Sequence, residues 1–102
     1  MNIEISKEKI ADFCRRWKIV EFSLFGSVLR QDFRPDSDVD VLVKFSADAE
    51  WSLLYHIAME EELSVMFGRK VDMVSRRAIE RSENYIRRQA ILETAQPYYV
   101  TR

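Results

Sequence analysis

The chain of 102 residues has almost none of the residues that build disulfide frameworks or transition-metal centres. Its one cysteine, Cys14, excludes an internal disulfide. Its one histidine, His56, together with that single thiol leaves no cluster of transition-metal ligands. Cys14 falls on the apolar stripe of a predicted helix, where we expect a core thiol.

Long apolar runs and an excess of one charge are also missing. No segment approaches the ~20 apolar residues that a membrane helix requires, and Met1 to Ile5 lacks the basic start and apolar core of a signal peptide. The 16 basic and 17 acidic residues create no overall field that would attract nucleic acid or anionic lipid. We therefore expect a cytoplasmic protein, one domain over residues 1–102, without membrane contact or direct nucleic-acid binding.

Glycine is scarce as well, and one of the two glycines, Gly26, lies where chemistry is expected. It separates the strand-like run 19–25 from a short predicted helix over 27–31. Without a Cβ atom, Gly26 lets the backbone turn with a positive φ and approach a ligand closely. Ser27 is placed to cap the helix beside an anion site, and Arg30 lies one turn along. Triphosphate oxygens fit this turn.

Two carboxylates follow after a short turn-rich segment, residues 32–37. Asp38 and Asp40 are two positions apart at the start of a run of β-branched residues, 39–45, that predicts a central strand. Alternation along a strand directs both side chains to one spot. Two such anions repel unless a cation lies between them, and hard oxygen ligands suit Mg²⁺. The sequence therefore predicts a magnesium site beside the Gly26 turn.

Three separated motifs resemble the pattern of the polymerase-beta-like nucleotidyltransferases, in particular the minimal nucleotidyltransferases that accompany HEPN toxins in prokaryotes. The motifs are Phe25-Gly26-Ser27 with Arg30, the segment from Arg34 to Phe45 with the Asp pair, and the segment from Phe67 to Val74. The likeness extends from about Phe22 to Ser75.

The resemblance implies a role for each site residue. Asp38, Asp40 and Asp72 would be catalytic and would hold Mg²⁺, two ions in the family's pattern. Gly26, Ser27 and Arg30 would bind the phosphates of ATP. The implied reaction transfers AMP to a hydroxyl group, a tyrosine by resemblance, of a HEPN-type ribonuclease toxin. The chain would then be the antitoxin and would form a hetero-oligomeric complex with that toxin.

Asp72 has a second interpretation, a solvent-facing carboxylate on an edge strand. The chain also departs from the family pattern around Arg30, with Val28, Leu29 and Gln31 in the turn. These departures leave open a non-catalytic antitoxin that neutralises its partner by occlusion. Transfer to a small molecule is a third alternative, which the lack of a second domain disfavours.

The remaining sequence predicts scaffold. Helices are expected after Ser6, over 51–67 and over 76–93, the last with Ile79, Ile86 and Ala90 inward. Glu60, Glu61 and Glu62 are expected to form a solvated face, and the apolar tail 98–100 would pack on the sheet edge or on a second protein. The order of elements predicts an α/β domain with a mixed sheet of three or four strands covered by helices.

Overall fold

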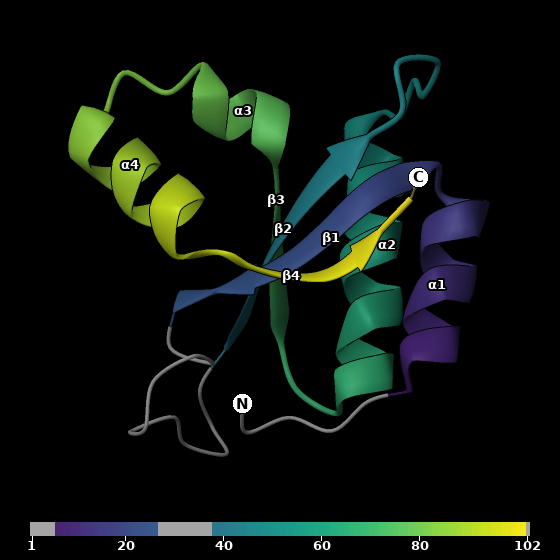
Figure 1. The fold of residues 1–102 in the computed structure, drawn as a ribbon. Coiled ribbons are helices and arrows are strands. Elements are labelled where there is room, and N and C mark those ends of the chain that lie inside the picture. Colours follow the sequence, from purple (N-terminus) through teal and green to yellow (C-terminus); the bar gives the residue numbers. More distant parts are fainter. Residues whose placement is uncertain (1–5, 27–37, 102) are drawn as a thin grey trace.

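The computed structural model describes residues 6–26 and 38–101 (Figure 1). Within these ranges the elements follow one another in this order: α1 (Lys7–Arg16), β1 (Ile19–Phe25), β2 (Val39–Phe45), α2 (Leu53–Phe67), β3 (Val71–Ser75), α3 (Arg76–Glu80), α4 (Tyr85–Thr94) and β4 (Gln96–Val100). The expected α/β class is confirmed. The short helix predicted over 27–31 lies outside the described residues. None of the helices in the described ranges has the length and apolar character needed to cross a bilayer.

The strands form one mixed sheet in the order β3-β2-β1-β4. β1 pairs antiparallel with β2 and with β4, whereas β2 and β3 run parallel. The tail of the chain is thus an edge strand, and the sheet-edge alternative for residues 98–100 is confirmed. Pro97 is tolerated in β4 because an edge strand leaves one row of backbone groups without a neighbouring strand.

β2 is an inner strand of the sheet, as its composition predicts. Val39, Val41 and Val43 are fully buried on one face, and Leu42 is buried on the other. α1 and α2 lie side by side over the first face (Figure 1). The main core forms there, from these residues: Ile10, Phe13, Cys14, Ile19, Phe22, Leu24, Val39, Val41, Val43, Met59, Leu63, Val71 and Met73.

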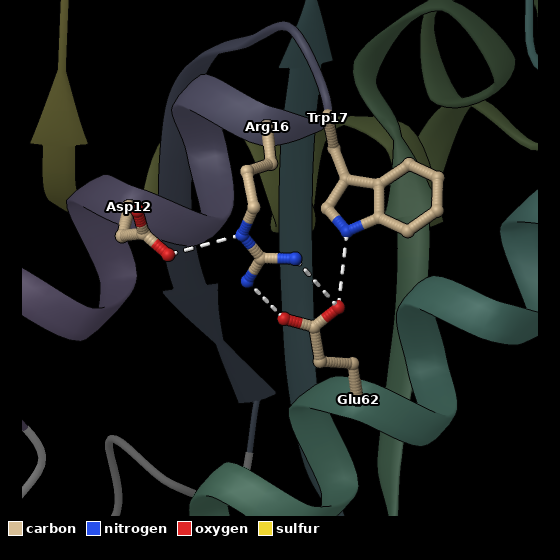
Figure 2. Close-up of polar contacts among 4 residues, drawn as sticks. All are labelled: Asp12, Arg16, Trp17 and Glu62. Carbon is tan, nitrogen blue, oxygen red and sulfur yellow. Dashed lines mark hydrogen bonds and ion pairs between the residues drawn. The ribbon is translucent and has the colours of Figure 1, made fainter.

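A cluster of polar side chains joins α1 to α2 beside this core (Figure 2). The Arg16 guanidinium donates to both carboxylate oxygens of Glu62, and Trp17 Nε1 donates to Glu62 at 3.2 Å. Asp12 also accepts from Arg16, at 3.0 Å. The expectation that Glu62 is merely solvated is therefore wrong, whereas Glu61, one residue away, is exposed.

The expected helix over 76–93 is wrong in one respect, because it is divided into α3 and α4. Ser75 Oγ accepts from the Ala78 N–H and begins α3, and Asn84 Oδ1 accepts from the Arg87 N–H at 3.0 Å and begins α4. The second cap changes which residues of α4 face the sheet.

The inward face of this segment is correspondingly different from the predicted one. Ile79 is buried as predicted, but Ile86 is 81% exposed and Ala90 is also exposed. Ile91 is buried instead. Together with Phe25 and Leu42, Ile79 and Ile91 make a second, smaller core on the other face of the sheet.

Candidate active site

Two of the predicted site carboxylates are register partners on neighbouring strands. The parallel register of β2 and β3 pairs Asp40 with Asp72. Asp72 lies between Val71 and Met73, which are buried against α1 and α2, so alternation directs Asp72 to the opposite face of the sheet. Asp40 is directed to the same face, because its neighbours along β2 are buried in the main core. Neighbouring strands are about 4.8 Å apart, which makes the two side chains adjacent.

Asp38 and Asp40 differ in exposure although they share the alternation of β2. Asp38 precedes the strand and is exposed, and Asp40 is half-buried inside it. Asp72 is exposed on the edge strand β3. The edge position of the alternative interpretation is therefore correct for Asp72, and its register with Asp40 places it at the candidate site all the same.

Gly26 lies beside Asp40, at the end of β1. It follows β1, whose last residue, Phe25, pairs with Asp40, and its φ of +77° is one that residues with a Cβ atom rarely adopt. A Cβ atom at this position would lie 2.4 Å from Asp40 Oδ2. Gly26 is thus packed closely against Asp40, and a glycine suits both the positive φ and this approach.

The same face of the sheet continues beyond the carboxylates into a small cavity of about 140 Å³. Leu42 and Leu92 line its apolar side. Its polar side holds Glu21, which pairs with Arg76 at 3.5 Å and with Lys44 at 3.8 Å. α3 and α4 pack on this part of the face through Ile79 and Ile91, which cluster with Phe25 and Leu42.

A larger pocket of about 440 Å³ lies between α2, α3 and the C-terminal end of β2. Trp51, His56 and Arg77 are among its lining residues. The predicted carboxylates lie at the N-terminal ends of β2 and β3, so this pocket is at the opposite end of the sheet. It is not the candidate site, despite its size.

The donor chemistry of the candidate site fits a hard divalent cation. Asp38, Asp40 and Asp72 offer carboxylate oxygens, the ligands that Mg²⁺ prefers. Two like charges on neighbouring strands are also more stable with a cation between them. Within residues 6–26 and 38–101, no three His, Cys, Asp or Glu side chains converge closely enough to form a metal site. The ligands are thus suited by type and by strand position, and their roles stay a prediction.

Two predicted phosphate ligands, Ser27 and Arg30, lie outside the described residues.

The structure adds a contact near Asp72 that the sequence did not indicate. Glu60, expected to be solvated, accepts a hydrogen bond from the Met73 N–H next to Asp72. No local sequence pattern predicts this contact, because α2 and β3 come together only in the folded chain.

Comparison with known sequences gives a consistent picture. The family model described as a nucleotidyltransferase domain matches residues 6–95. The protein adenylyltransferase MntA of Thermococcus cleftensis is 39% identical over 64 residues, which cover 63% of each chain. The chain thus spans less than two thirds of that relative. A candidate protein adenylyltransferase of Methanocaldococcus jannaschii is 33% identical over 79 residues, covering 78% of this chain and 83% of the relative.

Solved structures share the fold. A candidate minimal nucleotidyltransferase superposes with a TM-score of 0.68 at 34% identity, covering 89% of this chain and 87% of the other. A chain of a toxin–antitoxin crystal structure with AMP-PNP gives 0.73 at 22% identity, covering 96% and 76%. A chain from the Shewanella oneidensis complex of a tri-AMPylated HEPN toxin with its MNT antitoxin gives 0.62 at 22% identity, covering 93% and 70%. The last two are likenesses of fold alone.

Proposed function

The chain belongs to the nucleotidyltransferase domain family, and we propose that it transfers AMP from ATP to a hydroxyl group of a partner protein. One observation carries this proposal, namely the register that sets Asp40 opposite Asp72 with Gly26 in contact with Asp40. Nucleotidyl transfer needs a turn that admits phosphates and carboxylates that bind metal, and we propose these roles for Gly26 and for Asp40 with Asp72.

The side chains divide the work between nucleotide and metal. Gly26 lets the backbone approach the phosphates, and Ser27 and Arg30 are proposed to bind their oxygens. Asp38, Asp40 and Asp72 would hold Mg²⁺, which when bound supplies charge neutralisation at the leaving pyrophosphate and a lower pKa for the attacking hydroxyl.

The reaction is a displacement at the α-phosphorus. The acceptor oxygen forms a bond to this phosphorus, the bond to pyrophosphate breaks, and the hydroxyl proton leaves to a base. Asp72 is exposed, and in this proposal it is also the base that accepts that proton. The products are an AMP-modified acceptor and pyrophosphate.

We propose a HEPN-type toxin as the acceptor, with a tyrosine hydroxyl as the attacking group, so that the chain acts as an antitoxin in a complex with it. The support is the named activity of the Thermococcus relative and the shared fold of the MNT antitoxin from Shewanella. The cavity of about 140 Å³ on this face is small for a second substrate. A partner that brings its own hydroxyl to the exposed Asp72 carboxylate would need no such pocket.

The test is transfer of label from ATP labelled at the α-phosphate, with Mg²⁺ and a HEPN-type toxin as the acceptor. Wild-type protein should label the toxin, and Asp40→Asn should not. Asp48→Asn is the matched control, because Asp48 is an exposed carboxylate after the opposite end of β2. Equal labelling by wild type and Asp40→Asn would contradict the proposal, and label found only on small molecules would move the acceptor to that class.

A further inference from the structure

The strand that carries Asp72 is an edge of the sheet. The Lys70 carbonyl accepts from the Val39 N–H at 2.9 Å, which directs that group towards β2. Backbone groups of successive residues in a strand point to opposite sides, so those of Val71 and Met73 point away from β2. An unsupported outer edge leaves such groups without partners. The placement of Asp72, between these two residues, therefore depends on what holds the outer edge.

Side chains of α2 form hydrogen bonds with the backbone on the outer edge of β3. Ser64 Oγ accepts from the Val71 N–H at 3.0 Å. Glu60 Oε2 accepts from the Met73 N–H at 2.7 Å, and His56 Nε2 lies 2.9 Å from the Met73 carbonyl oxygen, to which it donates because a carbonyl only accepts. The three residues are spaced by four and so lie on one side of the helix. We call His56, Glu60 and Ser64 the α2 clamp.

The α2 clamp supplies hydrogen-bond partners that a fifth strand would otherwise give to the outer edge of β3. Its acceptors and donor pair with the two residues that flank Asp72, while Asp72 itself stays in register with Asp40. Ser64 Oγ also donates to the Glu60 carbonyl at 2.8 Å, which orients its lone pairs towards Val71. Glu60 makes a charge-assisted hydrogen bond, a class stronger than neutral ones.

We propose that Glu60, with the rest of the α2 clamp, is a positioning residue that holds Asp72 opposite Asp40 for metal binding. The inference rests on the proposed function, because it concerns the third carboxylate of that site. Sliding or fraying of β3 would separate Asp72 from Asp40, and each of the clamp's hydrogen bonds opposes that movement. Glu60 therefore acts on the metal site through the β3 backbone, without contact to the metal.

The experiment measures Mn²⁺ affinity, with the metal alone as probe, from the paramagnetic broadening of amide signals near the site. Glu60→Ala should weaken Mn²⁺ binding about tenfold, the lower end of the range for residues that orient metal ligands. Glu60→Gln should restore most of the affinity, because its amide oxygen still accepts from Met73. Glu61→Ala is the matched control, since Glu61 is exposed on the same helix, and it should bind Mn²⁺ like wild type.

A double-mutant cycle separates positioning from general destabilisation. In an Asp72→Asn background, Glu60→Ala should cause little additional loss of Mn²⁺ affinity, because the group that it positions is already gone. An equal loss in both backgrounds would overturn the proposal. So would an unchanged affinity in Glu60→Ala alone.

Hydrogen exchange of the Met73 amide gives a readout that does not depend on metal or activity. Glu60→Ala should exchange this amide faster than wild type, and Glu60→Gln should not; unchanged exchange in Glu60→Ala would overturn the clamp. Mn²⁺ binding without AMP transfer would contradict the proposed function and leave the positioning role standing. Failure of the wild type to bind Mn²⁺ would overturn both.

Discussion

Gly26 and Asp40 are packed so closely that a Cβ atom on Gly26 would lie 2.4 Å from Asp40 Oδ2. The contact joins the end of β1 to the start of β2 across the paired residues Phe25 and Asp40. A proposed metal ligand is therefore packed directly on the turn that is proposed to hold the phosphates.

Replacing Gly26 by alanine should abolish AMP transfer. The new methyl group would strain a backbone at φ +77° and displace the Asp40 carboxylate. Gly68→Ala is the matched control, since Gly68 has a similar φ of +69° but nothing within 4 Å of its Cβ position. Both changes should cost about 1–2 kcal/mol for the left-handed conformation, measured by urea unfolding. Only Gly26→Ala should lose labelling of the toxin, and retained labelling would show that the contact is dispensable.

Glu62 should give the protein a pH-dependent part of its stability. The hydrogen bonds from Arg16 lower the pKa of the Glu62 carboxyl below its ordinary value of 4.5. A lowered folded-state pKa adds stability that is fully present above 4.5 and is lost as the pH falls through the lowered value. Glu62→Gln should therefore cost about 0.5–1 kcal/mol at neutral pH, the range for partly exposed pairs, and less in acid.

The check for Glu62 is urea unfolding of wild type and Glu62→Gln at neutral and acid pH. Glu61→Gln serves as the control, because Glu61 is exposed beside it and should leave stability nearly unchanged. A difference between wild type and Glu62→Gln that stays constant with pH would exclude Arg16 as its source.

Truncation of Ile91 should lower the stability of the protein far more than truncation of Ile86. Ile91 is 5% exposed in the second core, and Ile86 is 81% exposed on the same helix. Ile91→Ala should cost about 2–3 kcal/mol because it leaves a cavity, whereas Ile86→Ala should stay within about 0.5 kcal/mol of wild type. Thermal unfolding of the two variants measures this. A larger loss of stability in Ile86→Ala than in Ile91→Ala would instead support the single helix over 76–93, with Ile86 inward, that the sequence predicts.

Cys14 should be inert in the folded protein. Burial raises the pKa of its thiol to about 12, so little reactive thiolate forms at mildly alkaline pH. Reaction with a disulfide reagent should be on the order of 100-fold slower in the native state than in concentrated urea. Rapid native labelling would mean that the main core opens readily near α1.

The sequence was most informative where a pattern is local. The run 39–45 predicts its strand because it is rich in β-branched valine, and alternation places Asp40 on the face opposite to Val39 and Val41. The position of Gly26 before the turn is equally local. The strand and Gly26 could be placed without a structure, whereas a common site for Asp38 and Asp40 stays a prediction.

Contacts between distant segments could not be read in the same way. The register that pairs Asp40 with Asp72 is set by how β3 packs on β2, and the roles of Glu60 and Glu62 depend on partners that lie far along the chain. A charged residue on a predicted helix reads as solvated when its partner is unknown. The division between α3 and α4 left a signal that the apolar spacing obscured, namely Asn84, a preferred N-cap residue.

The central claim is most directly tested by the intact mass of the HEPN-type toxin after co-expression with this chain. Wild-type protein should increase the toxin mass by one or more AMP units, and a chain carrying Asp38→Asn and Asp40→Asn should leave it unchanged. A toxin that is silenced and co-purifies with the wild-type chain, yet carries no AMP, would contradict the claim and make the chain an antitoxin that acts by occlusion.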